Sequence, residues 1–266
     1  MNKVYSEKDF EKHLENELKK IGYKKLLNTA YDAKLGLVPE DIIKFLRENQ
    51  SKQYKIVESN FQNQTDAKIL ERISDELNHR GLIDVLKNGI AFSGARFELV
   101  YFEPNNSLNP ELTNLYQKNI FTLIRQVYFS EQNRQSVDTV IFLNGIPLIT
   151  IELKNTLTGQ TAIDAVQQYI KDRSPNETLF KFKRCMVHFA LGNEEIFMTS
   201  KLEGNDTEFL PFNKDIINPV NPNGHKVSYF WEGLLQKNQI LDIIQNYLFI
   251  REDINRYDNT KKEILI

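Results

Sequence analysis

Apolar residues recur at helical spacing through the first ninety residues of the chain. Phe10, Leu14 and Leu18 fall on one side of a helix predicted over residues 7–21, and Ser6 stands where an N-cap is expected. The same spacing predicts three more helices in this part of the chain. They cover residues 40–48, which Pro39 would open, residues 66–79 and residues 81–89.

Two apolar runs in the middle of the chain have the composition of strands. Residues 137–143 and 148–153 are rich in Val, Ile, Leu and Phe, and the Asn144-Gly145 pair between them favours a tight hairpin turn. The rest of the chain alternates between the two kinds of pattern without an internal repeat. We expect strands at 95–102, 119–129, 184–191 and 195–200, helices at 159–173, 230–236 and 239–249, and polar loops at 103–116 and 213–224.

This order of elements predicts an α/β fold with a mixed central β-sheet flanked by helices and an extra helical region at the N-terminus. The 266 residues can form one large domain or two small ones. We expect residues 1–90 to be a mostly helical lobe, residues 91–250 to hold the sheet, and residues 251–266 to begin a linker.

Three charged residues lie at the open end of the predicted hairpin. Asp138 begins its first strand, and Glu152 and Lys154 end its second. Charges beside apolar runs are costly to bury unless they are paired, and a divalent cation is a suitable partner for two acids. We expect Asp138 and Glu152 to bind Mg²⁺, with the backbone carbonyl of Leu153 as a third ligand and Lys154 orienting a water or neutralising charge on a phosphate. The alternative is a surface hairpin with a solvated Glu-Lys pair.

The shared metal requires an irregular hairpin. Side chains alternate between the two faces of a strand, and a strict two-residue Asn-Gly turn would set Asp138 opposite Ile151. The carboxylates of Asp138 and Glu152 would then point to opposite faces. A β-bulge or a longer loop removes this conflict, and Pro147 cannot donate to the strand ladder. We therefore predict an irregular connection around residues 144–147.

The helix predicted at 159–173 follows the hairpin directly. Gln168 could position a water or a phosphate from it, and Tyr169 could contact the DNA backbone; a solvated Gln168 and a core Tyr169 are the alternatives. The formal net charge is −2, so contacts with nucleic acid must come from local patches or from partner subunits. The best basic patch consists of Lys171, Arg173, Lys181, Lys183 and Arg184, and the alternative for it is a solvated loop.

The run SVDTVIFLNGIPLITIELKNTLTGQTAIDAVQQYIKDR resembles the nuclease core of the restriction subunit of type I restriction-modification enzymes. The resemblance continues through LFKFKRCMVHFALGNEEIFMTSKLEGNDTEFLPFNK to YFWEGLLQ. It also reaches back to RQVYFS and to FEKHLENELKKIGY near the start. It is densest over residues 119–250, and it implies a restriction-endonuclease-like fold of the PD-(D/E)xK superfamily.

The resemblance also implies roles and partners. Asp138, Glu152 and Lys154 match the metal-binding Asp, the second acid and the lysine of that superfamily. Gln168-Tyr169 is similar to its Gln/Tyr motif, although Ala165 stands where some relatives place the glutamine. Glu11 is the candidate for a further metal ligand on the first helix. The implied cofactor is Mg²⁺, with Mn²⁺ as a substitute, and the implied partners are double-stranded DNA and the methyltransferase and specificity subunits.

That family cleaves DNA under the control of an ATP-driven translocase. No G-x-x-x-x-G-K-[ST] motif occurs in the sequence, so ATP would act only through a motor domain outside it. The apolar end KEILI leads us to expect that the chain is the N-terminal part of a larger subunit. Two other classes stay open: a stand-alone nuclease of the same fold, and a non-catalytic DNA-binding module.

The remaining composition is that of an ordinary globular protein. Hydrophobic residues make up 41% and charged residues 26% of the chain. A single cysteine, Cys185, excludes an internal disulfide and a cysteine metal cluster. The sequence contains no apolar run long enough to cross a membrane and no signal peptide, so we expect a cytoplasmic protein.

Overall fold

The predicted hairpin forms the centre of a seven-stranded sheet. The structure is a computed structural model that describes residues 7–104, 109–155, 159–222, 224–254 and 261–265. Its two central strands, β5 (Ser136–Leu143) and β6 (Ile146–Leu153), are almost completely buried. The other strands of this sheet are β1 (Lys24–Leu26), β4 (Phe121–Tyr128), β7 (Val187–Leu191), β8 (Ile196–Thr199) and β9 (Leu210–Pro211).

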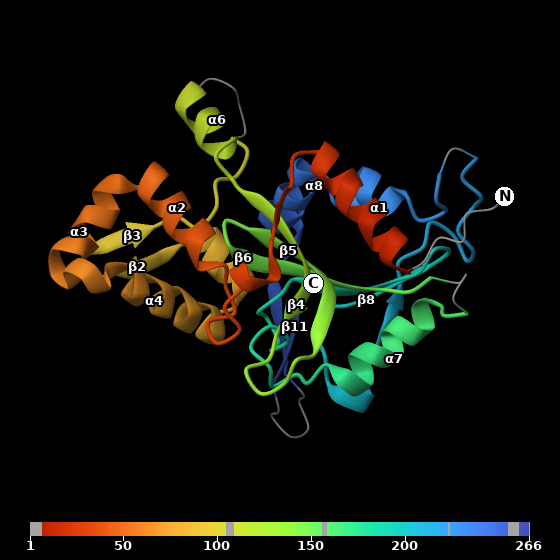
Figure 1. Cartoon of the computed structure of the whole chain (residues 1–266). Coiled ribbons are helices and arrows are strands. Elements are labelled where there is room, and N and C mark those ends of the chain that lie inside the picture. The colour runs from red at the N-terminus through yellow and green to blue at the C-terminus, as the bar shows by residue number, and fades with distance from the viewer. Residues whose placement is uncertain (1–6, 105–108, 156–158, 223, 255–260, 266) are drawn as a thin grey trace.

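The strand order confirms the predicted mixed sheet. It runs β1-β4-β5-β6-β7-β8-β9, with parallel pairing of β1 with β4 and of β6 with β7 and antiparallel pairing elsewhere. Helices α1 (Glu7–Lys20) and α8 (Lys237–Asp242) cover one side, and α7 (Ala162–Asp172) covers the other (Figure 1). The chain is therefore an α/β protein whose central strands have no solvent-exposed face.

Each face of the sheet has its own apolar cluster. Ile149, Ile151 and Leu153 pack on the α1 side together with Phe10 and Leu14. Val140 and Phe142 pack on the α7 side with Ala165, Val166 and Tyr169. Because both faces are covered, β5 and β6 are buried at nearly every position, as in buried sheets of other α/β proteins.

A helical lobe lies at one end of the sheet (Figure 1). Its buried residues belong to the same apolar cluster as the α1 side of the sheet. The division of the chain at residue 90 stays a prediction. The lobe consists of α2 (Pro39–Asn49), α3 (Ser51–Phe61), α4 (Thr65–His79), α5 (Leu82–Asn88) and the hairpin of β2 (Ile90–Phe92) and β3 (Ala95–Phe97).

Most predicted elements are confirmed, two predictions are wrong in part, and one helix was missed. The strand expected at 95–102 ends at Phe97 and pairs with β2 rather than with the main sheet. The polar loop expected at 103–116 contains α6 (Pro110–Tyr116), which Asn109 caps by accepting a hydrogen bond from the Glu111 N–H. Sequence periodicity also missed α3. The expected Ser6 cap lies outside the described residues.

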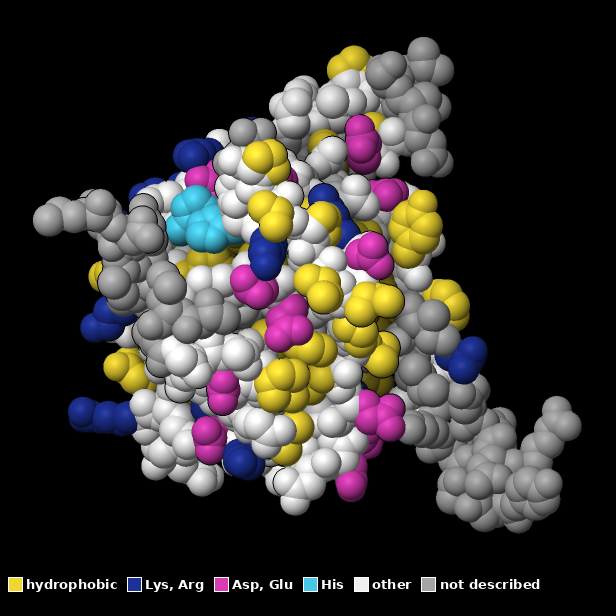
Figure 2. All heavy atoms as spheres, turned by 90° about the vertical axis from the view of Figure 1, so that its right-hand side faces the viewer, with side chains coloured by type: hydrophobic (Ala, Val, Ile, Leu, Met, Phe, Trp, Pro, Cys, Tyr) yellow, Lys and Arg dark blue, Asp and Glu magenta, His cyan; other side chains and the backbone are white. Residues whose placement is uncertain are grey.

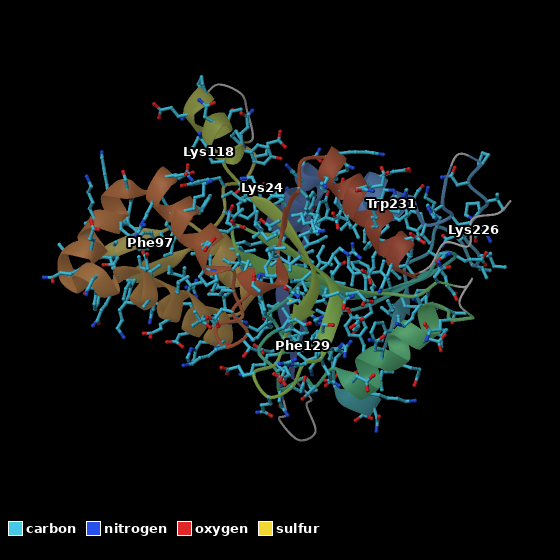
Figure 3. All side chains as sticks on the ribbon, in the orientation of Figure 1. Lys24, Phe97, Lys118, Phe129, Lys226 and Trp231 are labelled. Atoms are coloured by element: carbon cyan, nitrogen blue, oxygen red, sulfur yellow. The ribbon has the colours of Figure 1, made fainter. Side chains whose placement is uncertain are left out.

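The C-terminal part packs against α1 and the sheet. Trp231 and His13 lie edge to face, with ring centroids 5.3 Å apart, and Figure 3 places Trp231 beside α1. No described helix has both the length and the apolar character needed to cross a membrane. The other elements of this C-terminal part are two π-helical segments and a separate hairpin. The segments Phe230–Leu234 and Ile243–Tyr247 flank α8, and the hairpin consists of β10 (Ile250–Ile254) and β11 (Lys261–Leu265).

The connection between β5 and β6 combines a tight turn with a β-bulge. Leu143 pairs with Ile146 across the turn, so the Asn-Gly loop has two residues, and both have positive φ, as a type I′ turn requires. Phe142 pairs with Pro147, but Ile141 pairs with Ile149. Leu148 is therefore the extra residue. This confirms the predicted irregularity and places it one residue beyond the expected range.

Asn144 ties this turn to its surroundings. Its Oδ1 accepts a hydrogen bond of 2.7 Å from the Ile120 N–H, and its Nδ2 donates one of 2.9 Å to the carbonyl of Leu99. Gly145 is required next to it, because a Cβ at that position would lie 2.5 Å from the carbonyl oxygen of Val38.

We predict that Asn144→Ala lowers the free energy of unfolding by about 2–4 kcal/mol, because it leaves buried backbone groups unpaired and places a Cβ residue without a polar side chain at positive φ. Urea denaturation would measure the loss. Asn60→Ala, which removes an exposed side chain bonded to Ser93 Oγ, is the control and should cost less than about 1 kcal/mol. Equal effects of both variants would contradict this account of the turn.

Candidate active site

The bulge at Leu148 decides which side chains share a face. Val140 pairs with Thr150 and Thr139 pairs with Ile151, and the same register continued by one residue sets Asp138 opposite Glu152. Directly opposed residues of an antiparallel pair point to the same side of the sheet. The two carboxylates therefore face the same side, next to each other, as a shared metal requires. Without the extra residue they would face opposite sides.

Asp138 is held by two hydrogen bonds. Its Oδ2 accepts one of 2.8 Å from the Leu153 N–H, and its Oδ1 accepts one of 3.0 Å from Gln126 Nε2. The residue is only 6% exposed. Both donors fix the orientation of the carboxylate from within the sheet, since Gln126 belongs to β4 and Leu153 to β6.

Glu152 is fully buried and only half satisfied. Its Oε1 accepts a hydrogen bond of 2.6 Å from Arg173 Nε, in an ion pair between two buried side chains. Its Oε2 has no hydrogen-bond partner among the described residues. Burial raises the pKa of the Glu152 carboxyl, the negative charge of Asp138 raises it further, and Arg173 opposes both effects.

Glu11 reaches the same group of residues from α1. Gln126 Nε2, which donates to Asp138, also donates to Glu11 Oε1 at 3.1 Å. Glu11 Oε2 accepts from Arg125, the neighbouring residue on β4. Gln126 itself has a φ of 52°, a backbone conformation that residues other than glycine seldom adopt. This backbone conformation interrupts the β4–β5 pairing between Arg125 and Val127.

The described residues contain no group of three or more His, Cys, Asp and Glu side chains arranged to hold a metal ion. The convergence is that of two carboxylates, Asp138 and Glu152. Two carboxylates suit Mg²⁺, which keeps several of its waters. The buried Oε2 of Glu152 is an acceptor in need of a cation or a donor, so the residues present fit such an ion.

The other predicted site residues have different environments. Lys154 is buried, two residues beyond Glu152, and its backbone N–H donates to the carbonyl of Leu191 at 2.9 Å. Gln168 is half-buried on α7. The roles of both, like that of the Leu153 carbonyl as a metal ligand, stay predictions.

Tyr169 lies in the apolar cluster on the α7 side of the sheet. It is fully buried, and its hydroxyl lies 2.8 Å from Thr150 Oγ1, which is also 2.7 Å from His188 Nδ1. Burial, with the nearby charge of Glu152, raises the pKa of Tyr169, and burial lowers the pKa of His188 to about 3. Both side chains are therefore neutral near neutral pH. The burial of Tyr169 supports the alternative reading, in which it is a core residue.

Two members of the expected basic patch are also buried. Arg173 pairs with Glu152, and Arg184, only 1% exposed, donates to the carbonyls of Leu35 and Ser74. Because other residues cover both guanidiniums, their burial does not support the predicted contacts with DNA. Lys183 forms an ion pair of 2.8 Å with Glu263, while Lys171 and Lys181 are exposed.

Basic charge is dispersed over one face of the molecule. Figure 2 shows one face of the molecule on which Lys and Arg side chains are separate spots with Asp and Glu side chains between them. Of the patch predicted from the sequence, Lys171 and Lys181 are exposed, and Lys183 is partly exposed and paired with Glu263.

Sequence reasoning missed Gln126 and the pairing of Arg173. Arg125-Gln126 was visible as a polar pair inside the apolar run 119–129, and such a pair needs partners wherever the strand is buried. For Arg173 the sequence offered no comparable signal, because a basic residue at the end of a helix is ordinarily a solvated one.

Comparisons with known proteins identify the family and two relatives of this chain. A family model described as type I restriction enzyme R protein N terminus matches residues 4–207. A Methanocaldococcus jannaschii protein with the provisional name of type I restriction enzyme MjaVIIIP endonuclease subunit is 25% identical over 248 residues, which are 90% of this chain and 22% of that protein. The MjaVIIP endonuclease subunit of the same organism, also named provisionally, is 24% identical over 161 residues, which are 54% of this chain and 13% of that protein. The chain thus spans about a fifth or less of the length of these relatives.

We predict that Glu152 makes stability fall as the pH rises in the absence of divalent cations. Its carboxyl binds a proton more tightly in the folded protein than at the ordinary pKa of 4.5, so the free energy of unfolding decreases as the pH rises from 4.5 through the raised value. Glu152→Gln cannot titrate and should lack this decline. Urea denaturation at a series of pH values in EDTA would measure the difference. Glu71→Gln, at an exposed carboxylate, is the control and should keep the wild-type slope; a Glu152→Gln slope equal to that of wild type would contradict the prediction.

Proposed function

The chain belongs to the family of type I restriction enzyme R protein N termini, and from this premise we propose that it is a metal-dependent DNA endonuclease domain. The observation that carries the proposal is the placement of Asp138 and Glu152 on one face by the bulge at Leu148. The buried, unsatisfied Oε2 of Glu152 supports a cation at this place. The names of the two archaeal relatives support the same activity.

Each residue has a role in this proposal. Asp138 and Glu152 hold Mg²⁺ or Mn²⁺ by their carboxylate oxygens, with the Leu153 carbonyl as a third ligand. The bound ion supplies Lewis-acid stabilisation of the charge on the scissile phosphate. Lys154 places an ammonium two residues from Glu152, where it orients the attacking water or neutralises developing charge. Gln168 positions water or phosphate from α7.

Glu11 contributes from the first helix. Its Oε1 and Asp138 Oδ1 both accept from Gln126 Nε2, which places Glu11 near Asp138. We propose that it binds the same ion through water or helps to fix Asp138. Lys171, Lys181 and Lys183 are the basic side chains that remain for contacts with the DNA backbone.

The proposal extends to partners outside this chain. Cleavage in such an enzyme would be coupled to an ATP-driven translocase, and target recognition and host protection would belong to specificity and methyltransferase subunits. A stand-alone nuclease would cut DNA with Mg²⁺ alone. A non-catalytic DNA-binding module would bind DNA without binding metal at Asp138 and Glu152.

We predict that Asp138→Ala, Glu152→Ala and Lys154→Ala each lower the rate of DNA cleavage by at least about a hundredfold, because each removes a group from the reacting centre. The assay uses plasmid DNA, Mg²⁺ and ATP with the chain in its complete complex. A second assay uses the chain alone without ATP and tests the stand-alone reading. Asp75→Ala, which removes an exposed carboxylate from α4, is the matched control and should cut at the wild-type rate. Wild-type cleavage by all three site variants would end the catalytic assignment.

A further inference from the structure

We propose that Arg173 is a positioning residue that fixes Glu152 by one carboxylate oxygen and leaves the other free to bind the metal ion. This inference rests on the proposed function, since it assigns a role in the same site. It differs from the sequence-based expectation, which placed Arg173 among residues that contact DNA. It concerns the orientation of a ligand and not a step of the chemistry.

The guanidinium of Arg173 is held on several sides. Its Nε donates to Glu152 Oε1 at 2.6 Å, and one terminal nitrogen donates to the carbonyl of Ser136 at 2.9 Å. Its central carbon lies 5.2 Å from the centre of the Phe129 ring, and Figure 3 shows Phe129 on the α7 side of the central strands. The residue is 4% exposed. Its position is therefore fixed by the sheet.

The local backbone explains how Arg173 reaches this place. Helix α7 ends at Asp172, and Arg173 is its C-cap, with φ −114° and ψ 90°, an extended conformation. An extended residue directs its side chain away from the helical row. The helix itself begins with a capping box in which Thr161 and Asp164 bond to each other's backbone N–H groups, so both ends of α7 are defined.

The charges at the site require such a residue. Glu152 and Asp138 are neighbouring buried carboxylates, and two like charges out of water repel each other strongly. One guanidinium compensates one negative charge without filling the space at Glu152 Oε2. Arginine suits this task better than lysine, because its planar group stays charged and donates along fixed directions.

The pairing also leaves the carboxylate in a suitable orientation. With Oε1 bonded to Arg173 and Asp138 bonded through both of its oxygens to Gln126 and Leu153, the rotations of both acids are restricted. Partners of this kind, which bind a metal ligand rather than the metal, are known to change metal affinity by about tenfold to a hundredfold when they are removed. Arg173 is such a partner for Glu152, because its Nε–H donates to Glu152 Oε1.

The test is metal binding, measured with Mn²⁺ by electron paramagnetic resonance on the complete chain. We expect Arg173→Gln and Arg173→Lys to weaken Mn²⁺ binding by about tenfold or more, the latter because it keeps the charge but loses the fixed geometry. In the cleavage assay the same variants should lower kcat and leave KM for DNA nearly unchanged, because Arg173 is covered and touches no substrate. Unchanged Mn²⁺ affinity in Arg173→Gln would overturn the proposal. Tighter binding would also overturn it, since Arg173 would then be a competitor of the cation.

A matched control separates this effect from a general loss of stability. Arg80 also bonds carboxylates, those of Glu76 and Asp84, and a backbone carbonyl, that of Gly89, but it lies between α4 and α5 in the helical lobe. Arg80→Gln should lower the unfolding midpoint and leave Mn²⁺ affinity as in wild type. An equal loss of Mn²⁺ affinity in Arg80→Gln would show that stability, not positioning, decides the result.

A measurement on the wild type keeps the proposal testable if the variants fail to fold. The Nε–H of Arg173 is buried and hydrogen-bonded, so its NMR signal should be visible and protected from exchange with water. Added Mg²⁺ should shift this signal and leave it protected. Loss of the protected signal on addition of Mg²⁺ would mean that the ion displaces Arg173 and would overturn the proposal.

The proposed function and this inference can fail separately. If Glu152→Gln binds Mn²⁺ as tightly as wild type, Glu152 is no ligand, and the proposed function fails first. If Glu152→Gln loses Mn²⁺ binding while Arg173→Gln keeps it, the function stands and only the positioning role is lost.

Discussion

The structure depends on holding two neighbouring carboxylates inside a sheet that is covered on both faces. Transfer of an ionised group from water into a protein interior costs several kcal/mol, and a second like charge beside it adds to that cost. Both acids are nevertheless buried: Asp138 is 6% exposed and Glu152 is fully buried. Each neighbouring element contributes a compensating group: β4 supplies Gln126, β6 the N–H of Leu153, and the end of α7 Arg173. The compensation remains incomplete at Glu152 Oε2, and this incompleteness is the basis for a cation site.

One extra residue makes the arrangement possible. The Asn-Gly turn fixes a two-residue loop, and that loop alone would send the two acids to opposite faces. Leu148 restores the register that a shared ion needs, next to Pro147, which has no N–H to lose from the ladder. The hydrogen bonds of the Asn144 side chain hold this turn in place. The backbone N–H of Val38 also holds it by donating to the carbonyl of Gly145 at 2.8 Å. The geometry of the acids is thus coupled to the packing of the helical lobe through the far end of the hairpin.

The first helix is connected to the acids by a strained residue. Gln126 takes a positive φ in the middle of β4. Its side-chain Nε2 donates to both Glu11 and Asp138, and its side-chain Oε1 accepts from Ser136 Oγ at 2.8 Å. Unfavourable backbone conformations of this kind persist where the surrounding contacts determine them, and they concentrate at functional sites. Arg125 adds bonds to Glu11 and Glu15, so that a buried network joins α1 to the sheet. Because its members share partners, substitutions within this network should not be additive.

Local pattern was sufficient for much of the fold. Helices such as α1, α2, α4 and α7 and the central hairpin follow from the spacing of apolar residues and from Pro39 and Asn144-Gly145, because these signals act over a few residues. The spacing of Asp138, Glu152 and Lys154 also indicated the site, and the requirement that two acids share a face predicted the bulge. Where the local signal was weak, as in α3, α6 and the short strand β3, the sequence alone was insufficient.

The partners of the charged and aromatic side chains were decided only by the tertiary structure. Arg173 and Arg184 look like surface residues in the sequence, yet both are buried. The partners of Arg173 and Arg184 include residues 21 and 110 positions away. The role of a charged side chain depends on the groups that surround it in space. Those groups come from distant parts of the chain, so a local sequence pattern does not reveal them. The sequence by itself determined the main helices and strands and the two acids. Only the folded chain determined that the guanidinium of Arg173 is the positive charge beside Glu152.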